Sequence, residues 1–146
     1  MAAGRQVFIG LLAAAALLVA GAGPAQATTT VPFEATWSKV GCNGLCGTGF
    51  VAQFGSASIV SVITSFTPGS PCFSFTAVET ITVVGGTLTL SEVGSGCVLN
   101  ATAATPTAFS WTFTFTGGTG VFAGASGGGT GFHVGRTHLS GTLTLP

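Results

Sequence analysis

The segment Phe109-Ser110-Trp111-Thr112-Phe113-Thr114-Phe115-Thr116 decides the fold class. Every odd position is aromatic and every even position carries a hydroxyl group. Successive side chains of a β-strand point to opposite faces, so this segment predicts a strand with one apolar face and one hydroxyl face. No window after residue 27 has a helical hydrophobic period over ten or more residues. The chain is therefore expected to be all-β.

The same alternation recurs along the chain. It is clear over residues 73–83, 87–91 and 142–145, and weaker over 33–39, 49–55, 57–66, 97–101 and 130–136. Proline and glycine predict breaks at 68–71, 85–86, 94–96, Pro106 and 117–118. These segments predict about eight or nine short antiparallel strands.

An amphipathic sheet without helices must hide its apolar face by closing on itself or by packing on a second sheet. Closure also removes exposed strand edges, which a chain with only 4% charged residues has little means of protecting. We therefore expect a small closed antiparallel β-barrel of about eight strands. A β-sandwich is the alternative.

Residues 1–27 have the pattern of a secretory signal peptide. Arg5 precedes an apolar run over 7–22, and Ala25-Gln26-Ala27 forms a small-x-small cleavage site. The run is shorter than the roughly 20 residues that span a bilayer, which disfavours the alternative of a retained anchor. We expect a single secreted, extracellular domain over residues 28–146, with no membrane span after removal of the signal.

The composition excludes several functional classes. With 3 Lys+Arg residues in the whole chain, too few cations are present to neutralise a nucleic-acid backbone. A hydrophobic content of 47% excludes a charge-solvated disordered chain. The glycine-rich stretch 117–131 lacks the Gly-Lys-Ser/Thr ending and the following helix of a phosphate loop. No cofactor is expected.

Four cysteines, Cys42, Cys46, Cys72 and Cys97, lie in the exported part. An even number in a secreted chain indicates disulfides. Of the three pairings, we favour Cys42–Cys46 with Cys72–Cys97, because the first two cysteines are close together and flanked by glycines. The alternative is a zinc site of four thiolates, but the second pair is too widely separated to form a compact knuckle. No metal is expected.

The segment Gly117-Gly118-Thr119-Gly120-Val121-Phe122, followed by Ala123-Gly124-Ala125, resembles a turn of the allene oxide cyclase-like and dirigent-like barrels. The similarity is greatest to their secreted bacterial branch and covers about a dozen residues. It implies an eight-stranded barrel with an apolar cavity, in which Gly117, Gly118 and Gly120 form a barrel-end turn. Phe122 would fold back and plug that end. Plant members cyclise a fatty-acid epoxide or orient radicals, often with Asp or Tyr, and this chain has neither residue.

The candidate catalytic residues are Glu79 and Arg136. Glu79 shares its strand parity with Phe75 and Ala77, and Arg136 shares its parity with Phe132 and Val134. Both are predicted to face the interior, where they would form a polar anchor or a general acid/base for an apolar molecule. The alternatives are a structural ion pair, or a strand-end side chain that reaches solvent.

The remaining titratable residues are predicted to have no catalytic role. His133 and His138 are five residues apart, which places them on opposite faces of an unbroken strand, at the surface or the rim. Glu34 and Glu92 are interpreted as strand-end residues that interact with solvent.

Three functions remain open. The favoured one is a secreted, disulfide-stabilised barrel that is not an enzyme and binds a small apolar ligand. The second is an isomerase- or cyclase-like enzyme acting on a lipophilic substrate inside the barrel. The third is a structural or adhesive cell-surface protein with a filled barrel. Neither the ligand nor the oligomeric state follows from the sequence.

Overall fold

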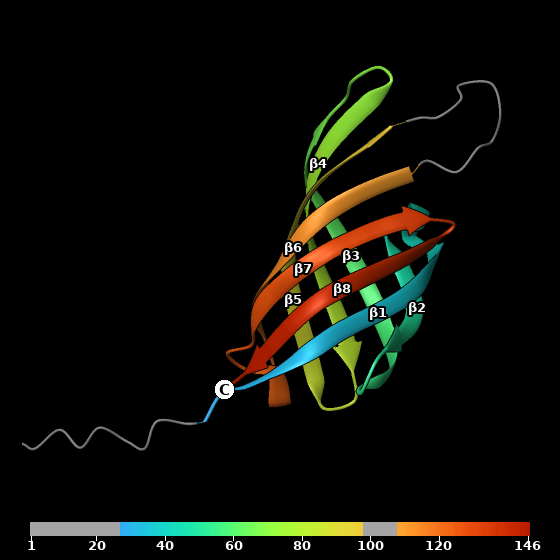
Figure 1. Ribbon diagram of the computed structural model, residues 1–146. Coiled ribbons are helices and arrows are strands. Elements are labelled where there is room, and N and C mark those ends of the chain that lie inside the picture. Colours follow the sequence, from blue (N-terminus) through green and yellow to red (C-terminus); the bar gives the residue numbers. More distant parts are fainter. Residues whose placement is uncertain (1–26, 98–107) are drawn as a thin grey trace, which may run out of the picture.

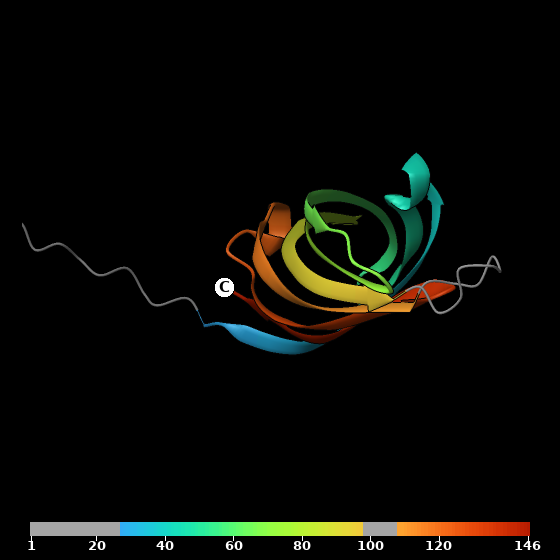
Figure 2. The same ribbon diagram turned by 90° about the horizontal axis from the view of Figure 1, so that it is seen from above.

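A computed structural model describes residues 27–97 and 108–146, so the predicted signal peptide lies almost wholly outside the described residues. The chain forms one closed antiparallel barrel in which each strand pairs with its sequence neighbours and β1 pairs with β8 (Figures 1 and 2). The strands are β1 (Thr29–Gly41), β2 (Cys46–Val51), β3 (Gly55–Thr67), β4 (Cys72–Val83), β5 (Gly86–Cys97), β6 (Ala108–Gly118), β7 (Ser126–Val134) and β8 (Arg136–Leu145). Two short 3-10 helices, η1 (Cys42–Gly44) and η2 (Gly120–Phe122), complete the described part. The predicted barrel is confirmed, and the sandwich alternative is wrong.

The alternation of aromatic and hydroxyl residues defines the two faces of β6. Trp111, Phe113 and Phe115 are buried inside the barrel, whereas the intervening threonines are exposed. The ring of Phe33 on β1 meets Phe115 across the interior with a centroid distance of 5.0 Å. The hydroxyl-coated exterior and aromatic interior predicted from the sequence are thus confirmed.

The predicted break at residues 94–96 is wrong, because β5 runs through Gly94 and Gly96 to Cys97. A Cβ atom on Gly94 would lie 2.5 Å from the Cβ of Trp111. These glycines therefore make room for rings on the neighbouring strands and do not end the strand. The predicted strand 97–101 contributes only Cys97, the last residue of β5, and its other residues lie outside the described ones, as does Pro106.

Three other strand boundaries differ from the prediction. The segment 49–55 is not one strand, since β2 ends at Val51 and β3 begins at Gly55. The segment 130–136 is interrupted at Gly135, which has a φ of 71° and forms the turn between β7 and β8. Gly117 and Gly118 lie within β6. The predicted breaks at 68–71 and at Gly85 are confirmed.

We call the end of the barrel that carries η2 and the β4–β5 turn the lower end, as drawn in Figure 1. Phe122 is completely buried there and packs edge-on against Phe54, with 5.0 Å between the ring centroids. Gly120 precedes it with a φ of 62°, and a Cβ atom at this position would lie 1.9 Å from the carbonyl oxygen of Gly85. The turn therefore requires glycine at position 120, and the ring of Phe122 lies buried at this end of the barrel.

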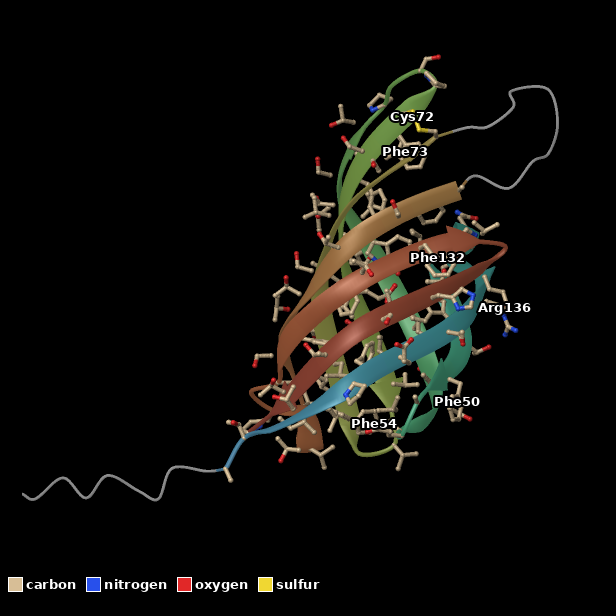
Figure 3. The ribbon with its side chains drawn as sticks, viewed as in Figure 1. Phe50, Phe54, Cys72, Phe73, Phe132 and Arg136 are labelled. Atoms are coloured by element: carbon tan, nitrogen blue, oxygen red, sulfur yellow. A yellow bond between two sulfur atoms is a disulfide. The ribbon has the colours of Figure 1, made fainter. Side chains whose placement is uncertain are left out.

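The structure contains both favoured disulfides, Cys42–Cys46 and Cys72–Cys97. Cys72 and Cys97 are register partners on β4 and β5 at the upper end of the barrel, where Figure 3 shows Cys72. All four cysteines therefore form disulfides and do not make up one zinc site.

Candidate functional site

The upper part of the barrel interior contains a cavity of about 170 Å³, which we call the upper cavity. Strands β3, β4, β5 and β6 supply its lining, which consists of Ser61, Ile63, Phe66, Phe73, Phe75, Ala77, Glu79, Glu92, Phe109 and Trp111. An apolar cavity of about 150 Å³ is large enough to hold benzene. The upper cavity therefore has room for about one aromatic ring or a short alkyl chain.

Aromatic side chains form most of the cavity wall. Phe75 lies edge-on to Phe109 at 6.0 Å and to Trp111 at 6.3 Å, measured between ring centroids. Phe73 and the half-exposed Phe66 lie 5.4 Å apart at the upper rim. These rings offer dispersion contacts to an apolar ligand from several directions.

Two carboxyl groups lie deeper in the cavity. Glu79 is 1% exposed and Glu92 is 4% exposed. Glu92 pairs with Ala77, and Glu79 lies two residues further along β4 on the same face, so the glutamates are diagonal neighbours on adjacent strands. The predicted inward orientation of Glu79 is confirmed. The interpretation of Glu92 as a residue that interacts with solvent is wrong.

Ser61 completes the polar part of the cavity. It is the register partner of Glu79, and its hydroxyl group donates a hydrogen bond of 2.6 Å to Oε2 of that residue. Ser61 was not among the predicted site residues, because a serine is common on a strand exterior. The signal was its parity, since Ser61 lies two residues after the inward-facing Ile59 on β3 and therefore on the same face.

The predicted inward orientation of Arg136 is wrong. Arg136 begins β8 directly after the turn at Gly135, and its side chain points away from the barrel (Figure 3). Phe132 and Val134 share its face as predicted, but they are 52% and 61% exposed. The guanidinium group is therefore separated from Glu79 by the barrel wall, and the two do not form the predicted interior pair.

The two histidines occupy opposite faces, as predicted, although a turn separates them. His133 on β7 stacks on Phe109 with 4.7 Å between centroids, and its Nδ1 lies 3.0 Å from the hydroxyl group of Thr137. His138 on β8 stacks on the exposed ring of Phe132 outside the barrel. No group of three metal-ligating side chains occurs among the described residues.

The third glutamate provides a reference on the outer surface. Glu34 is exposed, as predicted, but it lies within β1 and not at a strand end. Its Oε1 accepts a hydrogen bond of 2.6 Å from the hydroxyl group of Ser140. The protein therefore has two Ser–Glu pairs of equal length, one buried in the cavity and one in solvent.

The cavity supports two kinds of chemistry. Its rings and its volume suit an apolar molecule with a polar group at one end. Its carboxyl groups could also accept or donate a proton, which is the requirement for general acid–base catalysis. Both uses involve the same part of the interior.

The described residues contain no helix that is long and apolar enough to cross a membrane. No family model matches the chain, and no curated protein or solved structure matches it either.

Proposed function

We propose that the protein is an exported, disulfide-stabilised β-barrel that holds one small, largely apolar ligand in the upper cavity. The observation that carries this proposal is an aromatic-lined cavity of about 170 Å³ next to a cluster of buried apolar side chains. Interiors of small proteins are normally close-packed, so a cavity of this size forgoes contacts that a ligand would restore.

The volume limits the size of the ligand. Sites for drug-sized molecules usually measure about 300 to 1,000 Å³, well above the upper cavity. A long-chain lipid would therefore have most of its chain outside the barrel. This size favours a ligand of about one ring, with any longer tail passing the half-exposed rim residues Ile63 and Phe66.

Export is supported by the N-terminal pattern of residues 1–27 and by the two disulfides. We also propose that the protein is related to the allene oxide cyclase-like or dirigent-like barrels. This relationship is supported by the eight-stranded closure and by Phe122 at the barrel end.

Native mass spectrometry of protein recovered from culture medium tests this function. We expect a chain that begins at Thr28, contains two disulfides and either carries a small bound molecule or takes up added toluene. The matched variant Ala77→Leu places a larger side chain in the cavity, and it should lose this binding while remaining folded. A wild-type protein that carries no bound molecule and binds no added small molecule would instead favour the structural or adhesive role.

A second function, an isomerase- or cyclase-like enzyme, is favoured by the presence of two carboxyl groups in one cavity. If a molecule recovered from the barrel is converted by fresh protein, Glu79→Gln should abolish turnover and retain the fold. Glu34→Gln changes the same charge on the outer surface and should leave the rate unaltered. Equal rates in both variants would rule out a catalytic role for Glu79.

A further inference from the structure

The polar groups of the upper cavity determine which end group a ligand can present. The lining contains two acidic side chains, and none of its ten described residues is basic. Ser61 is a hydroxyl donor, but it already donates to Glu79. An ionised carboxylate has about four acceptor positions, so the carboxyl group of Glu79 can accept from more than one donor.

The one other donor in the lining is the indole N–H of Trp111. A Cβ atom on Gly131 would lie 2.5 Å from Nε1, which shows that this edge of the ring lies against the backbone of β7. Besides this N–H and the hydroxyl group of Ser61, the polar side-chain atoms of the lining residues are therefore the carboxyl oxygens of Glu79 and Glu92. Such a lining suits a ligand that donates hydrogen bonds and disfavours one that only accepts them.

Charge narrows the ligand class further. An ionised Glu79 or Glu92 would repel a carboxylate ligand, and an apolar wall screens this repulsion little. An ammonium group would form charge-assisted hydrogen bonds, which are roughly twice as strong as neutral ones. The rings of Phe75, Phe109 and Trp111 would also attract a cation through their π faces.

We propose that the ligand of the upper cavity is a small organic amine in its ammonium form, with a ring or short alkyl chain of about the size of benzylamine. This inference rests on the proposed function, because it names the ligand class for the same cavity. Glu79 and Glu92 accept hydrogen bonds from the ammonium group, and Phe73, Phe75, Phe109 and Trp111 surround the apolar part. The site rejects small carboxylic acids of equal size.

Calorimetric titration of the disulfide-intact protein with four probes of similar shape tests the proposal. The probes are benzylammonium, benzyl alcohol, toluene and benzoate. We expect benzylammonium to bind at least about tenfold more tightly than benzyl alcohol, which corresponds to about 1.4 kcal/mol. Toluene should bind weakly, and benzoate should not bind.

Charge-neutralising variants separate recognition of the amine from general apolar binding. Glu79→Gln and Glu92→Gln should each weaken benzylammonium about tenfold or more while leaving toluene unchanged. Glu34→Gln, which neutralises the exposed glutamate, should change neither. Toluene binding to each variant reports an intact cavity, so a variant that has lost its fold is recognised at once.

The outcomes distinguish the two proposals. If toluene and benzyl alcohol bind but benzylammonium has no advantage, or if benzoate binds equally well, the amine assignment is wrong and the ligand-binding function stands. If no probe binds to the wild-type protein, both proposals are wrong.

Discussion

The lower and upper ends of the barrel are stabilised by different chemistry. At the lower end, the completely buried ring of Phe122 packs against Phe54 and closes the interior. At the upper end, the rim residue Phe66 is 56% exposed, and the disulfide Cys72–Cys97 joins β4 to β5. The comparison shows that side-chain packing stabilises the lower end, whereas a covalent bond secures an upper end that retains internal volume.

Strand β4 shows how the sequence produces this difference. Its inward positions near the lower end are the β-branched residues Ile81 and Val83, which fill the interior. Toward the upper end the inward positions are Glu79 and then the small Ala77. A small residue and a buried carboxyl group in succession leave space that a β-branched pair would occupy, so the cavity is encoded within one strand.

Loss of the lower plug should have the largest effect on stability. Phe122→Ala removes a completely buried ring, and such substitutions lower the free energy of unfolding by about 3 to 5 kcal/mol. Its neighbour Val121 is 62% exposed, so Val121→Ala should change stability by less than about 0.5 kcal/mol. Urea unfolding of both variants measures the difference. Similar midpoints would show that the lower end is not stabilised by packing of this ring.

Loss of the Cys72–Cys97 disulfide should have the next largest effect. Cys72 and Cys97 are separated by 25 residues, and chain entropy predicts a loss of about 3.5 kcal/mol when both are replaced by alanine. The same replacement at Cys42 and Cys46, which are 4 residues apart, should cost about 2 kcal/mol. Denaturant titration of the two double variants tests the order. The opposite order would mean that the number of residues between the paired cysteines does not set the contribution of each disulfide to stability.

The two Ser–Glu pairs show how much the same hydrogen bond contributes to stability in the buried cavity and on the surface. Ser61→Ala removes a buried donor to Glu79 and should destabilise the fold by about 1 to 3 kcal/mol. Ser140→Ala removes a bond of equal length to the exposed Glu34, where water replaces the donor, and should cost less than about 0.5 kcal/mol. Thermal unfolding of both variants would reveal the contrast, and equal losses would contradict the burial of the Ser61–Glu79 hydrogen bond.

Much of this arrangement could be predicted from alternation alone. The inward face of β6, the inward position of Glu79 and the closed barrel all follow from the two-residue period and from the need to bury one face. The disulfide pairing followed from spacing, and it agrees with the register of Cys72 and Cys97. These features are local, or they follow from closing a single sheet.

The errors arose where glycines occupy inward positions. On β7 the inward position is Gly131, where a Cβ atom would lie 2.3 Å from the ring of Trp111. The larger residues Phe132 and Val134 consequently face outward, and Arg136 follows them. Gly94 likewise led to a predicted break, although β5 continues through this residue. Glu92 on the same strand faces inward. A sequence does not show which neighbouring ring fills the space beside a glycine, because that depends on register across strands.

The smallest effect on stability should come from filling the upper cavity. The same Ala→Leu substitution should change stability in opposite directions at the two ends of the barrel. Ala77 lines the upper cavity, so Ala77→Leu adds contacts in empty volume and should leave stability unchanged or raise it by up to about 1 kcal/mol. Ala125 is 4% exposed and follows η2 in the packed lower end. Ala125→Leu should therefore overpack the core and cost about 1 to 3 kcal/mol. The urea midpoints of the two variants test this difference. A loss of similar size at Ala77 would indicate that the upper interior cannot accommodate three additional carbon atoms. It could then not admit a ring-sized ligand.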